Sequence, residues 1–342
     1  MLAPPPKQRT LAASYRDLES LKPEVRVSAI EDLVRNVRAD DAERTKAIGA
    51  IEKLLADAHP RVRGTAAVGL ADLDANEAVP ALGKAVADED AWVRQMAMNA
   101  LGELGDPAAL PLLRKALADR RPDMRYQAII AFTRLEKDDS AVDKALLEAT
   151  NDDDDAVVHI ALRLVEERID GGKTPDGRLL SRAKTLTKAE SVHLVVVAAI
   201  LLAKAGDASG HDVVLAVVRG DRVRGQKPEK EDEQAAVELA GAIGLEGAKP
   251  ALEKRAWGIA GWVKDTSKFH ARIALARMGH PRAIEEIQKE LGSSSREVVS
   301  AAVVAAGRGR VRAARAAIEK LTAAMVDPEL AKEALALLED GA

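Results

Sequence analysis

The sequence has no cysteine, few aromatic residues and almost no net charge, and each of these features excludes a class of function. Without cysteine there is no disulfide, no thiolate metal ligand and no cysteine nucleophile. Aromatic residues make up 2% of the chain, which disfavours β-sheets, because sheets are enriched in aromatic and β-branched side chains. A formal net charge of −4 supplies no overall field that would draw in nucleic acid or an anionic membrane.

Long apolar runs are also missing from the sequence. No run approaches the length of a transmembrane helix, and residues 1–9 lack the apolar stretch of a signal peptide. We therefore expect a soluble, cytoplasmic protein without membrane insertion. The wealth of alanine, arginine and aspartate suggests a bacterial source.

What the sequence does contain is an internal repeat, which is visible when 60–74, 91–106 and 122–135 are aligned. Each stretch has an acidic or proline-containing turn, an apolar residue followed by arginine or a similar residue, alanine four residues later, and a large apolar residue eight later. Positions 0, 4, 7 and 8 share one face of an α-helix, and the mean spacing of about 34 residues accommodates two helices and two turns. Position zero, the first apolar residue, falls at Val25, Val62, Val93, Met124, Val157, Leu194, Asp232, Ser267, Val298 and Leu330.

A second amphipathic segment precedes each of these helices, as in 79–88 and 110–119. Proline recurs near its start, where the N–H of the first helical turn has no intrahelical partner. The sequence therefore predicts pairs of helices, with the proline positions at Pro80, Pro111, Pro175 and Pro250.

This pattern resembles the short form of the HEAT-like repeat family, known from phycobilisome lyases, over residues 10 to 340. The resemblance implies an all-α fold, a right-handed α-solenoid of about ten helix pairs with the second helices lining a concave face. It does not imply one function, since the family includes scaffolds, adaptors, lyases and DNA-repair proteins. We expect one solenoid over 1–342, with a flexible N-terminus (1–9), regular repeats (10–165), repeats with elaborated edge loops (166–290) and C-terminal repeats (291–342).

Arginine follows position zero in the first four repeats, and aspartate recurs near the ends of the preceding first helices. Such residues could form a basic stripe for phosphate. Because arginine and aspartate repeat together, we expect instead a ladder of charge-assisted hydrogen bonds between repeats. Its members are Arg26, Arg63, Arg94 and Arg125 with Asp57, Asp88 and Asp119.

Repeats six to eight depart from the regular spacing, and irregularities in a repeat array often mark a binding face. We expect longer connections there between the two helices of a pair. The segment 219–233 is rich in charge and predicts a mobile, solvated loop. The next segment contains Trp257 and Trp262, which either pack against a neighbouring helix or form an aromatic anchor for a partner.

Positions +2 and +6 of the second helices lie opposite the core stripe, because successive residues are about 100° apart around a helix. They should face the concave side. An ordinary solvated face is mainly charged, but this one is partly apolar, so it predicts either a partner-binding groove or burial between tightly packed repeats. The candidate residues are Tyr126, Ile130, His159, Arg163, Val196, Ile200, Phe269 and Ile273.

Enzymatic and nucleic-acid-binding functions have weaker support in the sequence. None of the six histidines is followed by glutamate, the dyad that holds iron in HEAT-like hydroxylases, and we expect no metal site. The acidic run 151–155 lacks the spacing of a calcium loop and should cap a helix. No nucleophile–base pair is recognisable, so we expect no catalytic residues. The best basic cluster is Arg308, Arg310, Arg312 and Arg315.

We therefore predict a non-catalytic scaffold or adaptor that binds a protein partner in the concave groove, with Trp257 and Trp262 as a second, edge site. We expect neither a cofactor nor a small-molecule ligand, and nucleic acid is not the expected partner. Two alternatives stay open: a nucleic-acid-binding protein that uses the Arg308–Arg315 cluster, and a lyase-like HEAT-repeat enzyme.

Overall fold

The computed structural model describes residues 9–37, 41–258, 267–321 and 328–339. In these ranges the chain is α-helical, with short 3₁₀ turns and no β-strand beyond one isolated bridge between Val223 and Gln226. The chain folds as two compact units, Met1–Leu164 (unit 1) and Val165–Ala342 (unit 2). Along the sequence, the boundary between the units falls one residue before the expected change from regular to elaborated repeats.

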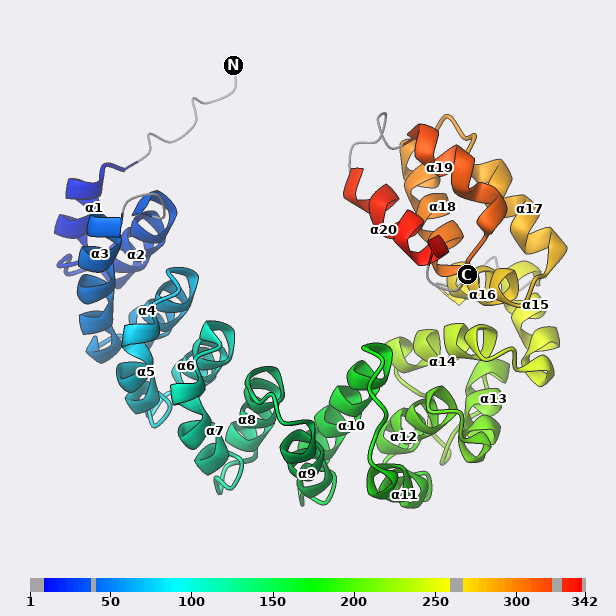
Figure 1. Ribbon diagram of the computed structural model, residues 1–342, viewed down its shortest axis with the longest axis horizontal. Helices are drawn as coiled ribbons and strands as arrows, with labels where there is room; N and C mark the ends of the chain where they lie inside the picture. Colours follow the sequence, from blue (N-terminus) through cyan, green and yellow to red (C-terminus); the bar gives the residue numbers. More distant parts are fainter. Residues whose placement is uncertain (1–8, 38–40, 259–266, 322–327, 340–342) are drawn as a thin grey trace. The chain divides into compact units, whose positions relative to one another are not determined.

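Unit 1 consists of helix pairs in which a first helix is followed by a second, as the repeat pattern predicts (Figure 1). The first helices are α1 (Leu11–Asp17), α3 (Asp41–Lys53), α5 (Val79–Ala85), α7 (Leu110–Ala116) and α9 (Asp139–Ala149). The second helices are α2 (Pro23–Val37), α4 (Pro60–Asp72), α6 (Ala91–Leu104), α8 (Pro122–Leu135) and α10 (Asp155–Asp170), whose last turns belong to unit 2.

Unit 2 continues the alternation. Its first helices are α11 (Gly177–Leu186), α13 (His211–Arg219), α15 (Lys249–Trp257), α17 (Pro281–Glu290) and α19 (Arg315–Leu321). Its second helices are α12 (Val192–Lys204), α14 (Lys230–Ala242), α16 (Ser267–Arg277), α18 (Arg296–Arg308) and α20 (Pro328–Glu339).

The predicted register of the repeat is confirmed. Position zero lies two residues after the first residue of every second helix except α16, which begins at position zero itself. Local chemistry explains several of these starts: α2, α4, α8 and α20 begin with proline, and a carboxylate caps α6 and α10. Asp90 caps α6 through the N–H groups of Trp92 and Val93, and Asp154 caps α10 in the same way. The acidic run 151–155 therefore contains a cap, as expected.

Second helices of successive repeats pack on one another and form a layer. In unit 1, α4 contacts α2 and α6, and α6 contacts α8. Figure 1 shows this layer on the inner side of the unit's curve, with α5 and α7 on the outer side. The residues at position +8, such as Leu33, Leu70 and Leu101, are fully buried between the two layers. The apolar stripe read from the sequence is thus the core of the unit.

The predicted ladder of arginine and aspartate joins the repeats of unit 1. Nε and Nη2 of Arg63 each donate to the Asp88 carboxylate at 2.8 Å, and Arg26 Nη2 donates to Asp57 Oδ1 at 2.7 Å. Each arginine also donates to a backbone carbonyl in its own repeat, as Arg63 Nη1 does to the Asp57 oxygen at 2.9 Å. Because each guanidinium bonds to two repeats at once, it fixes their relative position.

One rung of the ladder differs from the prediction. Asp119 does not pair with Arg94, because Arg121 lies two residues further on and its guanidinium takes both carboxylate oxygens, at 2.9 and 3.0 Å. Arg94 Nη2 instead donates to Asp123 at 2.8 Å. The next rung is Arg125 with Asp152, which forms two hydrogen bonds of 2.6 Å.

The expected longer connections of repeats six to eight are only partly present. In repeat six the extra residues lengthen helix α11, and the connection to α12 is as short as in unit 1. In repeat seven the connection is long and its residues 220–229 are exposed, as expected, except for Val223 and the half-buried Pro228. Arg224 and Gly225 form a tight turn with positive φ, closed by the Val223–Gln226 bridge, and Val223 is buried in the core. The repeat-eight segment 259–266 lies outside the described residues.

Candidate binding groove

The inner layer of unit 1 carries an exposed aromatic side chain, Trp92, at the start of α6. The side chain is 40% exposed, which is unusual for an indole in a chain with so few aromatic residues. Its ring packs against α4 of the preceding repeat, over Gly64, where the absence of a Cβ atom leaves room for it. Trp92 is therefore held against the layer while part of the residue stays exposed.

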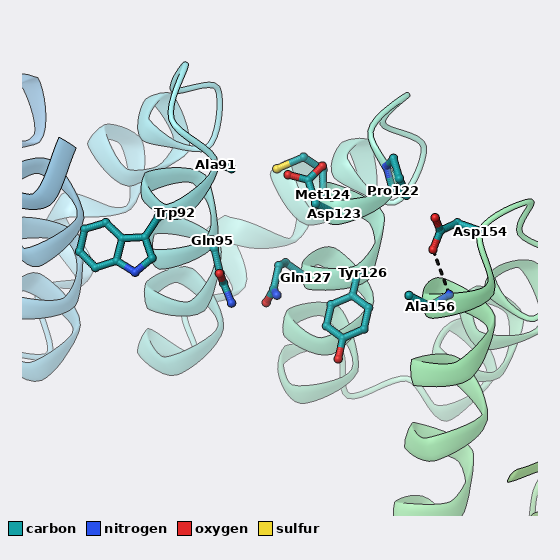
Figure 2. A pocket seen from close by; sticks show the side chains of 10 residues that line it. All are labelled: Ala91, Trp92, Gln95, Pro122, Asp123, Met124, Tyr126, Gln127, Asp154 and Ala156. Carbon is teal, nitrogen blue, oxygen red and sulfur yellow. Dashed lines mark hydrogen bonds between the residues drawn. The ribbon is translucent and has the colours of Figure 1, made fainter. Parts of the chain in front are cut away.

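A cavity of about 560 Å³ lies beside Trp92 along the inner layer (Figure 2). Trp92 and Gln95 on α6 line one side, and Tyr126 and Gln127 on α8 line the other. Asp154, at the N-terminus of α10, lines the far end, where its carboxylate caps that helix. The cavity combines two aromatic rings with two amide groups, a lining that can bury an apolar side chain and hydrogen bond to a backbone.

A second cavity, of about 460 Å³, lies on the other side of the same indole. It is lined by α2, through Glu31 and Val34, by α4, through Val68 and Asp72, and by Trp92. Val68 is itself 37% exposed. Trp92 therefore belongs to both cavities, and the two together form a partly apolar surface over five successive second helices, from α2 to α10. We call this surface the Trp92 groove; it consists of Val68, Trp92, Gln95, Tyr126 and Gln127.

The sequence placed Tyr126 and position +6 on this face, but Trp92 was not among the predicted groove residues. The signal was available from helical geometry. Trp92 precedes position zero by one residue, so it stands seven residues before position +6, and seven residues make nearly two full helical turns. Positions −1 and +6 therefore share a face. A glycine at position +2 of the preceding repeat, Gly64, was the second signal.

The other predicted groove residues of unit 1 are half-buried. Tyr126 lines the first cavity, and Ile130 lies one turn further along α8. His159 and Arg163 lie on α10, also half-buried and each engaged in interactions of its own. The structure thus brings Tyr126 together with Trp92 and Gln95, whereas a role of Ile130, His159 and Arg163 in partner binding stays a prediction.

In unit 2 the expectation of exposed apolar residues is wrong for Val196, Ile200 and Ile273, which are at most 1% exposed. Helix α12 is apolar on every side, with a continuous buried run from Leu194 to Ala203, and a helix of this kind belongs to the core. These three residues therefore match the alternative reading, burial between repeats.

Close helix packing explains why this face is sealed around α16. A Cβ atom on Gly241 of α14 would lie 2.3 Å from the Cα atom of Ala274 on α16, so only glycine permits the observed approach. The equivalent glycine of unit 1, Gly102, leaves more room, since a Cβ atom there would lie 3.1 Å from the Cβ atom of Ala131. Phe269, on the same helix, is half-buried, packs on this core and meets the ring of His270 edge-on.

The predicted edge site is only partly described, because Trp262 lies outside the described residues. Trp257 is the last residue of α15 and is half-buried. Its Nε1 donates to Glu286 Oε2 at 2.9 Å, and the guanidinium of Arg282 lies 4.3 Å from its ring centroid. These contacts to α17 match the packing interpretation of Trp257, and its use as a partner anchor stays a prediction.

The basic cluster of the alternative hypothesis is divided in the structure. Arg308 and Arg310 line one cavity of unit 2, whereas Arg312 and Arg315 line another. Arg308 pairs with Glu238, and Arg315 pairs with Glu319 and Glu339. A phosphate backbone needs several free cations in a row, and this cluster does not provide them.

Asp232 was the weakest fit to position zero, and its role became visible only in the structure. The residue stands where the other repeats have an apolar side chain, and it is 1% exposed. His193 Nδ1 on α12 lies 2.8 Å from its Oδ2 atom. A buried carboxylate requires such a partner, so this pair is a polar link between repeats six and seven.

The comparisons with known proteins agree with this architecture. Residues 16–94 and 79–165 each match the family model of HEAT repeats. Residues 16–165 therefore match HEAT repeats, and the chain has the fold of an α-solenoid. No curated protein matches the sequence.

Solved structures are similar to this chain to different degrees. YibA of Escherichia coli is 14% identical, with a TM-score of 0.54 over 79% of this chain and 93% of YibA. The complex of CpcE and CpcF of phycocyanin lyase from a Nostoc species is 17% identical, covering 83% of this chain and 96% of that chain, with a TM-score of 0.37. An engineered protein, also 17% identical, covers 97% and 99% with the same TM-score. The similarity to YibA concerns the fold and does not extend to a function.

Membrane insertion through a helix has no support among the described residues, where every helix is too short or too polar to cross a bilayer.

Proposed function

We propose that the protein is a non-catalytic adaptor that holds a segment of a protein partner in the Trp92 groove. The observation that carries the proposal is the position of Trp92, which is 40% exposed and lines two adjacent cavities. Tryptophan is among the residues that contribute most to protein interfaces, especially where it is fixed before binding. The HEAT-repeat fold supports the same reading, since its layers of helices present extended surfaces to other proteins.

The dimensions of the groove suit a peptide segment. Packed helices are about 8–10 Å apart, and the two cavities are centred about two helices apart, so side chains bound in them would be separated by about 16–20 Å. An extended chain rises about 3.3 Å per residue and covers that distance in about five or six residues. A helix covers it in about 11–13 residues, at about 1.5 Å per residue. The amides of Gln95 and Gln127 would hydrogen bond to polar groups of either kind of segment.

The proposal is tested by affinity measurements on a partner that wild-type protein captures from its source cells. Trp92→Ala and Tyr126→Ala should each weaken binding of the purified partner at least tenfold, a loss of about 1.4 kcal/mol or more in binding free energy. The matched control is Val298→Ala, because Val298 is an exposed apolar residue of unit 2 with 37% exposure. Helical circular dichroism should be unchanged in all three variants. Wild-type affinity in both groove variants would contradict the proposal.

A further inference from the structure

Unit 2 contains a cavity of about 590 Å³ whose lining is rich in charge. Three basic residues there, Lys204, Arg277 and Arg308, are the last residues of α12, α16 and α18. A cation at a helix C-terminus is favourable in itself, because it complements the helix dipole. The helix dipole is thus enough to explain why basic residues stand at these helix ends, without a bound ligand. The distinguishing feature of the cavity is which of its cations form ion pairs.

The carboxylates of the cavity are already engaged with two of these cations. Lys204 Nζ lies 2.8 Å from Glu166 Oε1 and 2.7 Å from Asp170 Oδ2. Arg308 Nη2 lies 2.5 Å from Glu238 Oε2. Within the part of the chain that the structure describes, no carboxylate forms an ion pair with the two other guanidinium groups of the lining.

These two groups belong to Arg277 and Arg310. Burial by surrounding protein atoms and the positive charge of Arg310 lower the pKa of Arg277, although Arg277 remains charged. Two like charges thus lie near one another, and the carboxylate that acts on Arg277, Glu238, is shared with Arg308 and His270. Such an arrangement is unfavourable unless an anion binds between them.

The backbone of Arg310 has φ of 51°, in the left-handed region that residues with a side chain rarely adopt. The corresponding position of other repeats, twelve residues after position zero, is Gly105, Gly206, Gly244 and Gly279, all with positive φ, and Asp74, which has φ of 51° as well. Glycine takes this conformation at no steric cost, so the arginine at this position costs stability. The left-handed turn belongs to the repeat, and the side chain at this position is what distinguishes Arg310.

We propose that Arg277 and Arg310 bind a phosphate group in this cavity. A phosphate dianion would neutralise both guanidinium groups and would accept paired hydrogen bonds from each planar fork. The cavity is open enough for a free phosphate ion or for the phosphate monoester of a small molecule, which share this chemistry. The site lies in unit 2 and does not depend on the Trp92 groove.

Isothermal titration calorimetry at constant low ionic strength tests the proposal, with inorganic phosphate, glycerol phosphate and succinate as separate probes. Wild-type protein should bind phosphate in one-to-one stoichiometry, and Arg277→Gln and Arg310→Gln should each weaken it at least tenfold. Arg296→Gln, which removes an exposed arginine from the other end of α18, is the control with the same change of charge and should bind as wild type. Tighter binding of glycerol phosphate than of inorganic phosphate would identify the monoester as the ligand, and the reverse order would identify the free ion.

A variant that separates binding from folding is Arg310→Gly, which restores the glycine of the other repeats. It should raise the melting temperature, because it relieves the left-handed strain, and should lose phosphate binding. The proposal is overturned if wild type does not bind phosphate, if the arginine variants bind it as well as the Arg296→Gln control, or if succinate binds as tightly as phosphate.

Discussion

The indole of Trp92 lies so close to the backbone of Gly64 that a Cβ atom there would be 2.1 Å from its Cζ3 atom. The two residues belong to successive repeats, on α6 and α4. The glycine thus determines where the tryptophan lies, and the tryptophan in turn lines both cavities of the groove. The shape of the proposed binding surface therefore depends on a residue that contributes no side chain to it.

Gly64→Ala should displace Trp92 while leaving the fold intact. The ring is the end of a side chain and can move away from the new methyl group, and alanine favours the helix by about 1 kcal/mol relative to glycine. We expect altered tryptophan fluorescence and weaker partner binding, with a small change in stability. In a Trp92→Phe background the same substitution should leave the fluorescence unchanged. A change of equal size in that background would show that another tryptophan responds.

Gly241→Ala should have the opposite character, because the nearest atoms belong to the backbone of Ala274, with the Cα atom 2.3 Å away. A backbone inside a packed layer cannot move aside as a ring can, so we expect a loss of about 2 kcal/mol or more in the free energy of unfolding. Urea denaturation measures it. The control is Gly49→Ala in α3, where a Cβ atom meets nothing within 4 Å and where we expect a gain of about 1 kcal/mol. Equal effects at the two sites would contradict the packing of α14 on α16.

Arg63→Met should destabilise unit 1, because it leaves the Asp88 carboxylate, with 11% of its side chain exposed, without its bidentate partner. Losing hydrogen bonds to a charged group costs about 1.5–3 kcal/mol, and the methionine keeps most of the apolar stem. Thermal or urea unfolding gives the value. Arg61→Met, at an exposed position of the same helix turn, should change stability by less than about 0.5 kcal/mol. Similar losses in the two variants would show that the ladder contributes little.

Unit 1 should lose stability in acid. The hydrogen bond from Arg125 lowers the pKa of Asp152, against the raising effect of burial. Burial alone would raise the pKa of Asp88, but hydrogen bonds from Arg63 and from the Asp90 N–H outweigh it and lower the pKa. A carboxyl whose pKa is lower in the folded state stabilises the fold above its unfolded pKa, about 3.9, and this stabilisation is lost as pH falls through the folded pKa.

We therefore expect the free energy of unfolding to fall as pH is lowered through the region around 4 and below, in urea titrations at a series of pH values. Asp152→Asn should be less stable than wild type at neutral pH and should show a shallower dependence on acid. A stability that is constant from neutral to strongly acidic pH would contradict the role assigned to these pairs.

The periodic features of this protein could be predicted from the sequence, because each is repeated. Position zero at Val62, Val93 and Met124 predicted where the second helices begin. The joint recurrence of arginine and aspartate predicted that Arg26 pairs with Asp57 and Arg63 with Asp88. Repetition averages out local ambiguity, so a hydrophobic period shared by several repeats is a stronger signal than any single helix.

What could not be predicted depends on single substitutions within the pattern. Arg121 forms hydrogen bonds to Asp119, and Arg94 pairs with Asp123 instead. The pattern common to the repeats does not reveal this competition, because Arg121 is particular to one repeat. Exposure on the inner layer depends on how closely neighbouring helices approach. That distance is set by residues such as Gly241, whose effect cannot be read from its own helix. Tyr126 therefore lines a cavity, whereas Ile273, a similar apolar candidate, is buried.

Site-specific photo-crosslinking in the source cells tests the central claim most directly. A photoreactive residue would replace Gln95 or Tyr126 in the Trp92 groove, or Lys84 or Lys115, which are exposed on the first helices α5 and α7. We predict that both groove positions crosslink to the same protein, that the outer positions do not, and that Trp92→Ala abolishes the adduct. Adducts to that protein from the outer positions alone, or in equal yield from all four, would contradict partner binding in the groove.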